Sequence, residues 1–328
     1  MDDLAGSVPD VSVCIVNWNT RELLRRCLQS IRDRTTGLAV EVIVVDNASR
    51  DSSAEMVAAH FPETRLLVSD QNLGFARGCN LAAAAATGRY VLYLNPDTEL
   101  VSNAIFGMWA HLASHPGHGA VGCRTLNTDG SIQLTCAGSF PTPRNELSSL
   151  LGLDRLFPGS KLCSARELGY WDHADSRDVE CLSGACMMLP RALVQKLAGF
   201  DENLFMYGED LDLCRRVRGQ GLALHYLASE VIVHHDGSAS KTRGRSFAPL
   251  YQRAANYYFL RKHFGRANAL AYRSAVSVGA AARLLALCLG SPLWLLRHHE
   301  RSGEMAGFLA RHTDLLLWSI GLKGLPAR

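Results

Sequence analysis

The chain has 328 residues, of which 48% are hydrophobic and 20% are charged. This is the composition of a folded globular protein, and it excludes a chain that is disordered throughout. The length suits one large domain, or one domain with an appendage. The formal net charge of +3 is small, but its distribution along the chain is uneven.

Basic residues are concentrated toward the C-terminus. Residues 241–328 contain 14 Lys and Arg and three acidic residues, whereas residues 1–240 contain 20 basic and 28 acidic residues. This asymmetry indicates that the C-terminal part faces an anionic partner: membrane headgroups, nucleic acid or a phosphorylated lipid. The alternative is an ordinary solvated basic surface.

The ten cysteines give no support for a structural zinc site, because no CxxC pair occurs among them. Several lie in apolar runs, where reduced cysteine packs as a small hydrophobic side chain. The N-terminus is acidic and lacks the apolar core of a signal peptide. We therefore expect a reducing, cytoplasmic setting.

Strands and helices are predicted to alternate four times in the first hundred residues. Apolar runs at 11–16, 40–45, 65–68 and 90–94 indicate buried strands. Helices are expected after Thr20, from Ser52 and from Phe75, the third closed by Gly88. Apolar strands separated by helices are typical of a parallel sheet with helices on both faces.

Polar residues follow each of these strands. Ligands of such sheets bind at the carboxyl ends of the strands. Asn and Asp are also common in turns, which explains any one of these groups more easily than all of them. The sequence therefore predicts a nucleotide-type ligand near Asn17, Asn19, Asp46, Asn47, Asn72, Asn95 and Asp97.

The second half of the chain is less regular. Residues 137–180 contain several prolines, and we expect a flexible connection or lid there. An apolar run at 179–189 leads to a helix opened by Pro190. A further helix is predicted at 209–217, and a last strand at 230–233 ends in His234-His235.

Residues 274–296 are long and apolar enough for a membrane-spanning helix. Arg283 lies near the middle, where insertion costs about 2.5–3.5 kcal/mol, and Gly290, Ser291 and Pro292 are expected to break the helix. A segment lying in the membrane interface fits this pattern better, and a helix packed on the core is the alternative. The flanking arginines are Arg266, Arg273, Arg297 and Arg301.

Three motifs are candidates for chemistry. In Asn95-Pro96-Asp97, the proline makes the chain leave the strand sharply, and a carboxylate held there either caps a turn or binds Mg²⁺ or Mn²⁺ with substrate phosphates. In Glu209-Asp210, the acids either complement a helix dipole or supply a general base for a hydroxyl nucleophile. Asp212 is expected to be solvated or structural.

The third motif is His234-His235. A histidine at a strand end near acids is either a structural residue or a metal ligand through its neutral imidazole. Successive residues of a strand point to opposite faces, so we expect one histidine to face the site and the other to face away.

Taken together, these motifs resemble the inverting family 2 glycosyltransferases over roughly residues 10–265. Segments 11–19, 42–52, 72–80, 94–98, 200–215 and 233–240 carry the resemblance and occur in the family's order. The most similar subgroup is the bacterial rhamnosyltransferase-type enzymes of O-antigen, capsule and cell-wall assembly. The resemblance implies a GT-A fold, an α/β sandwich with a central mixed, mostly parallel sheet.

The resemblance also implies roles for the candidate residues. Asp97 matches the last acid of the family's metal motif, which often has an acid where this chain has Asn95. His234 matches a metal-binding histidine of some relatives, with His235 as the fallback. The implied cofactor is Mg²⁺ or Mn²⁺.

The same resemblance makes Asp210 the catalytic base and Glu209 its supporting neighbour. The implied reaction is a single direct displacement that inverts the anomeric carbon. The implied donor is a dTDP- or UDP-linked sugar, with rhamnose favoured. Asn17, Asn19 and Asp46 are expected to line the nucleobase and ribose pocket, and Asn72 and Asn80 to lie near the nucleotide or sugar.

The expected organisation is a GT-A domain at 1–265, with a nucleotide-binding half at about 10–100 and an acceptor half at 101–265, and a basic, apolar helical region at 266–328. The expected acceptor is a glycan or polyprenyl-diphosphate-linked saccharide. The expected location is the inner face of the cell membrane, on an anionic surface. No nucleic acid is expected as a partner, and a homo-oligomer is left open.

Three other classes of protein fit the sequence less well. A dinucleotide-binding oxidoreductase needs a GxGxxG turn after the first strand, but the turn here is Asn17-Trp18-Asn19-Thr20. A catalytically silent sugar-nucleotide-binding or scaffold protein at the membrane is the main alternative, and the presence of both Asp97 and Asp210 argues against it. The basic tail has no recognisable nucleic-acid-binding motif.

Overall fold

The computed structural model describes residues 8–235, 247–297 and 302–326, which form two compact units. The first unit comprises residues 1–138 and 172–239, and the second comprises 139–171 and 240–328. The second unit therefore includes a segment from the middle of the chain, in addition to the helical region expected at 266–328.

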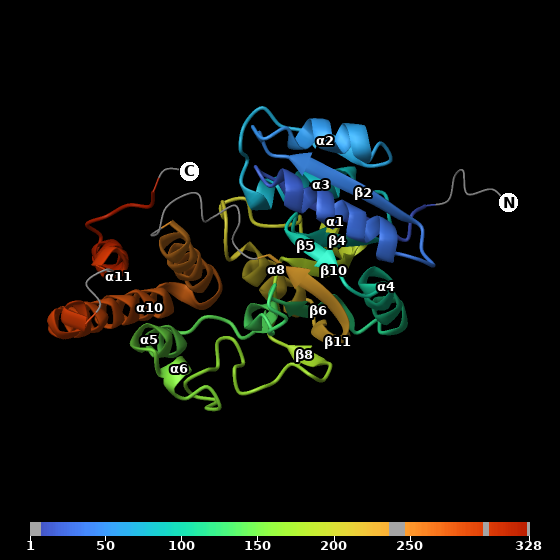
Figure 1. Ribbon diagram of the computed structural model, residues 1–328. Helices are drawn as coiled ribbons and strands as arrows, with labels where there is room; N and C mark the ends of the chain where they lie inside the picture. The colour runs from blue at the N-terminus through green and yellow to red at the C-terminus, as the bar shows by residue number, and fades with distance from the viewer. Residues whose placement is uncertain (1–7, 236–246, 298–301, 327–328) are drawn as a thin grey trace. The chain divides into compact units, whose positions relative to one another are not determined.

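The first unit is built on a mixed sheet, in which nine strands are described (Figure 1). Its order is β3-β2-β1-β4-β10-β6-β11-β5, and β8 pairs with β11. Strand β1 is parallel to β2 and β4, and β2 is parallel to β3. The bounds of this parallel part are β1 Val11–Asn17, β2 Val40–Asp46, β3 Arg65–Val68 and β4 Tyr90–Leu94.

The other part of the sheet is mainly antiparallel. Strand β10 runs antiparallel to β4 and β6, while β11 is parallel to β6 and antiparallel to β5 and β8. The bounds are β5 Thr98–Leu100, β6 His118–Leu126, β8 Arg177–Val179, β10 Cys186–Pro190 and β11 Ala223–His234. Two short strands, β7 Ala137–Gly138 and β9 Cys181–Leu182, form a separate pair.

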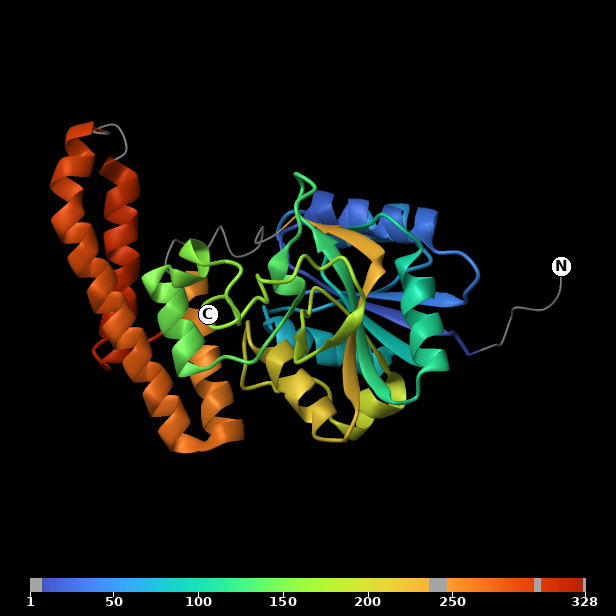
Figure 2. The same cartoon turned by 90° about the horizontal axis from the view of Figure 1, so that it is seen from below.

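Helices cover both faces of the large sheet (Figure 2). Val11, Val13 and Ile15 alternate along β1 and pack in one core with apolar residues of α1, α2 and α4. On the other face, Gly78 of α3 lies against Val16, and α8 contributes Val217 beside Gly119. The bounds are α1 Arg21–Arg34, α2 Ser53–His60, α3 Phe75–Ala85, α4 Ala104–Ser114, α7 Arg191–Lys196 and α8 Glu209–Arg218.

The second unit is helical in its described residues, with α5 Pro143–Leu151, α6 Leu153–Leu156, α10 Phe247–Arg297 and α11 Ser302–Ser319. Helix α10 is broken at Gly265, where φ is 84° and ψ is 171°. Arg253 of α10 is paired with the buried Glu146 of α5 at 2.9 Å, and Tyr272 donates to the same carboxylate at 2.7 Å. Arg273 donates to the carbonyl of Ser319 and so ties α10 to α11.

The bounds of the first four strands agree with the sequence prediction to within one residue. The caps of the helices between them differ from the prediction. Thr20 and Ser52 occupy the N-cap positions without a side-chain cap hydrogen bond. Thr20 donates to Asn17 instead. Helix α3 ends with Ala86 as its C-cap, and Gly88 is needed for close packing, since a Cβ there would lie 2.7 Å from the Ser12 nitrogen.

Three later expectations also require correction. Residues 137–180, expected as a flexible connection, include the capped helix α5. The last strand, β11, is 12 residues long and contains an irregular register between Leu227 and Val231, because its partners extend the pairing beyond the apolar run. Helix α10 continues through residues 290–292 to Arg297 rather than breaking there. Arg301 lies outside the described residues.

Within α10, Phe247–Leu289 is long and apolar enough to cross a membrane by length and composition alone. Only 22% of its apolar window is buried inside the structure, so most of that surface is exposed.

Candidate active site

Asn17 and Asp46 lie opposite each other at the carboxyl ends of β1 and β2. Asn17 Nδ2 donates to Asp46 Oδ1 and to Ser49 Oγ, both at 3.0 Å, and Asn17 Oδ1 accepts from Thr20 at 2.6 Å. Asp46 also accepts the backbone amide of Ser49. Both side chains are buried, so their hydrogen bonds fix the loops after the two strands.

Asn19 is the exposed member of this group. Its φ is 52°, a left-handed conformation that Asn tolerates better than most residues. Its amide donates to Ser49 Oγ at 3.0 Å, and its side-chain oxygen accepts the amide of Arg50 at 2.7 Å. The two loops are therefore held together, with Asn19 at their surface.

Asn72 is joined to the same edge through Asn47. The buried Asn47 donates to Asn72 Oδ1 at 3.1 Å and to the carbonyl of Gly74 at 3.2 Å, and it accepts the amide of Leu73 at 2.8 Å. Gly74 has a φ of 83°, and a Cβ there would lie 2.6 Å from the Phe205 carbonyl. This close approach explains why glycine stands at the start of α3.

Asn80 is used in a different way from the other asparagines. Its side chain accepts the amide of Phe200 at 2.8 Å and donates to the Phe200 carbonyl at 2.9 Å and to Glu202 at 3.1 Å. These bonds tie α3 to the segment that leads into α8. Asn80 therefore orients that segment, and its amide is fully engaged in doing so.

Asp97 and His234 meet at the end of β11, where His234 pairs with Thr98 of β5. His234 Nε2 lies 3.1 Å from Asp97 Oδ1 and 3.2 Å from Asn95 Nδ2. Asp97 is 7% exposed and His234 is 8% exposed, so this contact is largely shielded from water. His235 instead contacts Glu99, with 2.7 Å between Nε2 and Oε1.

The tautomer of His234 follows from its second contact. Gln133 Nε2 donates to Asn127 Oδ1 at 3.1 Å, so Gln133 Oε1 faces His234 Nδ1 at 2.8 Å and accepts its proton. In the neutral ring this leaves the lone pair of Nε2 directed at Asp97.

These residues fit a hard divalent cation. In this tautomer His234 Nε2 and the Asp97 oxygen are two acceptors 3.1 Å apart, an arrangement that a cation bound to both would stabilise. Asn95 Oδ1 is buried without a hydrogen-bond partner among the described residues. A flip of this amide brings that oxygen toward His234. Two oxygens and one imidazole suit Mg²⁺ or Mn²⁺ completed by phosphate and water.

Glu209 and Asp210 begin α8, after Tyr207 and Gly208 take positive φ values of 69° and 80°. Asp210 is half-buried and accepts the amide of Gly184 at 3.1 Å. Glu209 is buried, and its Oε2 has no hydrogen-bond partner in the part of the chain that is described. Burial, and then the charge of Asp210, raises the pKa of Glu209 to about 8. Glu209 is therefore protonated at neutral pH.

Asp212 lies two positions beyond this pair. It is fully buried and accepts from Arg216 Nε at 2.7 Å, so it is structural rather than solvated.

One strand pairing connects the two acidic groups. Asn95 donates its amide to the carbonyl of Ala185 at 2.9 Å, and the preceding residue, Gly184, donates to Asp210. The register Cys186↔Leu94 between β10 and β4 fixes this arrangement. Asp210 and the Asp97 loop are thus held at the same edge of the sheet.

Several residues that position the site were absent from the sequence prediction of site residues. Gln133 and Asn127 set the His234 tautomer, Ser49 joins two loops, and Gly184 donates to Asp210. Their sequence neighbourhood carries no signal for these roles. Asn47, which also positions the site, does carry such a signal, because it directly follows Asp46 at a predicted strand end.

The chain is similar in sequence and in fold to several known proteins. Residues 12–157 match the family described as glycosyl transferase family 2. A Mycobacterium tuberculosis protein named N-acetylglucosaminyl-diphospho-decaprenol L-rhamnosyltransferase is 25% identical over 264 residues, covering 77% of this chain and 85% of its own. The chain contains a family 2 glycosyltransferase domain.

Two further relatives extend the similarity of this glycosyltransferase. The low-salt glycan biosynthesis hexosyltransferase Agl10 of Haloferax volcanii is 26% identical, covering 74% of this chain and 72% of its own. A Pyrobaculum calidifontis mannosyltransferase, solved with GDP-Man and Mn²⁺, has a TM-score of 0.51 and 18% identity and covers 95% of this chain and 88% of its own. The GT-A-like fold expected from the sequence is confirmed.

The raised pKa of Glu209 predicts a specific pH dependence of stability. Between pH 4.5 and about 8 the unfolded carboxyl ionises while the folded one stays protonated, so folding loses stability as pH rises through this window. Glu209→Gln should abolish that loss. In urea titrations, the variant should gain stability relative to the natural glycosyltransferase as the pH rises from about 5 to about 8. Parallel profiles for the two proteins would refute the burial argument.

Proposed function

We propose that the protein transfers a sugar, with rhamnose favoured, from a dTDP- or UDP-linked donor to a glycan or polyprenyl-diphosphate-linked acceptor, with inversion, in bacterial cell-surface polysaccharide synthesis. The observation that carries this proposal is the buried group of Asp97, His234 and Asn95, held at one sheet edge with Asp210. A silent sugar-nucleotide-binding protein would not require both groups.

The donor is proposed to bind over the loops after β1 and β2. Asn19 is exposed there and is the member of its group suited to direct contact, while Asn17 and Asp46 hold the loops in shape. Asn72 is half-exposed beside Asn47 and is suited to contact the nucleotide or sugar. Asn80 is proposed to act indirectly, through the segment that leads to α8.

Asp97 and His234 are proposed to hold Mg²⁺ or Mn²⁺ against the diphosphate. A divalent cation supplies Lewis-acid stabilisation of the negative charge that develops on the leaving group. The protein's own contribution is to fix the tautomer of His234 through Gln133 and to exclude water from the Asp97 carboxylate. Asn95 replaces a carboxylate of the fuller family motif, and its orphaned oxygen supports a neutral ligand at that position.

Asp210 is proposed to take the proton of the acceptor hydroxyl as that hydroxyl attacks the anomeric carbon. It is half-buried and oriented by the amide of Gly184. Glu209 cannot assist as an anion near neutral pH, because its pKa of about 8 keeps it protonated. We therefore assign Glu209 a packing role beneath the base.

The acceptor proposal rests on the Mycobacterium tuberculosis relative, whose name specifies a decaprenol-linked substrate. Such a substrate lies in a membrane, and the second unit presents an apolar surface that suits one. The exposed apolar side chains on α10 are Phe264, Leu270, Val278, Leu285 and Leu289, while Phe308 lies on α11 and Ile320 directly follows it. With the excess of basic residues in 241–328, this supports peripheral binding to an anionic inner membrane face.

Asp210→Asn tests the proposed reaction. With Mn²⁺, a panel of dTDP- and UDP-sugars and a polyprenyl-diphosphate-linked saccharide, the natural protein should release nucleoside diphosphate. The variant should lose about 100- to 10,000-fold in kcat, because a general base contributes that much, and should keep its affinity for the donor. Glu63→Gln, an exposed carboxylate paired with Arg32, is the matched control. Donor binding without turnover by the natural protein would contradict the enzyme proposal.

His234→Ala and His235→Ala form a matched pair that tests the cation site. The His234 side chain lies against the Asp97 carboxylate, whereas the His235 side chain contacts Glu99, so His234→Ala should weaken Mn²⁺ binding by about tenfold or more, while His235→Ala should bind nearly as the natural protein does. Calorimetry in the presence of nucleoside diphosphate measures both. Equal losses in the two variants, or none in His234→Ala, would refute the assignment.

Leu285→Glu combined with Leu289→Glu tests the proposed membrane surface. These side chains are 61% and 71% exposed on α10, so their replacement should leave the fold intact and reduce flotation with anionic vesicles by about tenfold or more. Val68→Glu changes a similarly exposed residue of the first unit and should float normally. Unchanged flotation of the double variant would exclude this surface.

A further inference from the structure

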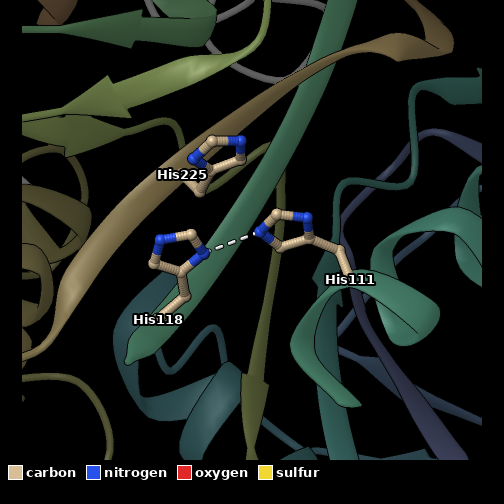
Figure 3. Close-up of side chains that lie close together, drawn as sticks. All are labelled: His111, His118 and His225. Carbon is tan, nitrogen blue, oxygen red and sulfur yellow. Dashed lines mark hydrogen bonds between the residues drawn. The ribbon is translucent and has the colours of Figure 1, made fainter. Parts of the chain in front are cut away.

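Three histidines gather close together in the first unit (Figure 3). They lie at the opposite ends of β6 and β11 from the candidate active site. His118 begins β6, His225 lies near the start of β11, and His111 is on α4. His234, by contrast, ends β11. Asp178 of β8 pairs with His225 across the sheet. Three elements of the first unit and a neighbouring carboxylate therefore meet at one point.

One nitrogen from each of the three rings lies within 4.8 Å of the others. His111 Nε2 and His118 Nδ1 are 2.7 Å apart, the contact drawn as a dashed line in Figure 3. The ring of His225 is nearly parallel to both, with centroids at 4.4 Å from His111 and 4.7 Å from His118. All three side chains are half-buried.

Asp178 determines which nitrogens keep their lone pairs. Its Oδ1 accepts from His225 Nδ1 at 2.7 Å and faces His118 Nε2 at the longer distance of 3.5 Å. This leaves His225 Nε2 and His118 Nδ1 as the ring nitrogens that point away from Asp178 and are available to a cation. A carboxylate behind a histidine is the usual support of a metal-ligating imidazole, because it fixes the tautomer and raises the basicity of the ligand nitrogen.

We propose that His111, His118 and His225 form a second metal site, which takes a borderline d-block cation such as Zn²⁺, with Asp178 orienting two of the three ligands.

The chemistry of the cluster favours such an ion over a hard one. Three imidazole nitrogens suit Zn²⁺, whereas Mg²⁺ and Mn²⁺ prefer oxygen. Metal ligation requires neutral imidazole. Water supplies the fourth ligand of a tetrahedral ion at a half-exposed position.

Binding requires a local rearrangement of defined extent. The proton on His111 Nε2 moves through solvent to Nδ1 of the same ring, which stays neutral, and the facing nitrogens of His111 and His118 separate from 2.7 Å to roughly 3.4 Å, the spacing of two nitrogens on one tetrahedral Zn²⁺. The ring of His225 turns out of its parallel arrangement so that its lone pair meets the same ion. The bound ion would tie α4 to β6 and β11, which links a helix to two strands of the sheet.

The test uses the full chain carrying His234→Ala, so that the candidate active-site cation does not contribute. After removal of metals with a chelator, Zn²⁺ alone is titrated by calorimetry, and Co²⁺ alone is followed by its visible absorption. We expect one Zn²⁺ per chain, the absorption of tetrahedral Co²⁺ with nitrogen ligands, and a rise in Tm. Thiolate ligation, which the exposed Cys288 could supply, gives a different Co²⁺ spectrum and would count against the proposal.

Variants then assign the site. His111→Ala and His225→Ala should each abolish the tetrahedral Co²⁺ spectrum, and Asp178→Asn should weaken Zn²⁺ about 10- to 100-fold. His60→Ala, at an exposed histidine that ends α2, should bind as its parent does. Circular dichroism without metal shows whether each variant folds. If a histidine variant does not fold, Asp178→Asn still tests the site. The proposal would be overturned if Asp178→Asn and the folded histidine variants bound Zn²⁺ as their parent does. It would also be overturned if His60→Ala weakened Zn²⁺ binding as much as they do.

Discussion

The candidate active site depends on the register between β11 and β5. In this antiparallel pair His234 lies opposite Thr98, and the amide of His235 continues the ladder by donating to the Asp97 carbonyl at 2.8 Å. Because side chains alternate along a strand, a slip of one residue would exchange His234 for His235. The register brings together residues 137 positions apart, and it decides which of two adjacent histidines contacts Asp97.

The polar residues around this contact differ in role because their surroundings differ, even where the residue type is the same. Glu209 and Asp210 are neighbours in the chain, yet the first is buried with a raised pKa and the second is half-buried and bonded to Gly184. The asparagines divide in the same way. Asn17 and Asn80 are engaged within the protein, whereas Asn19 is exposed. Few of these polar side chains can therefore contact a ligand, and the others hold those few in position.

The sequence predicts the first four strands well because each is a continuous apolar run that needs no partner to be recognised. It also locates Asp97 and Asp210, since their motifs are local. Long-range pairing is not visible in this way. The full length of β11 depends on β6 and β8, and Gly88 is required by the backbone of Ser12. The histidine cluster forms only when β6, β11 and α4 pack together, so the spacing of the histidines in the sequence does not predict it.

The central claim is that the group of Asp97, His234 and Asn95 holds the divalent cation of a sugar-transfer reaction. The most direct measurement is an anomalous difference map from crystals grown with Mn²⁺ and a nucleoside diphosphate. The account predicts a peak in contact with His234 Nε2 and an Asp97 oxygen, with the diphosphate completing the coordination. A Mn²⁺ peak elsewhere, with the His234–Asp97 contact unchanged at 3.1 Å, would contradict it.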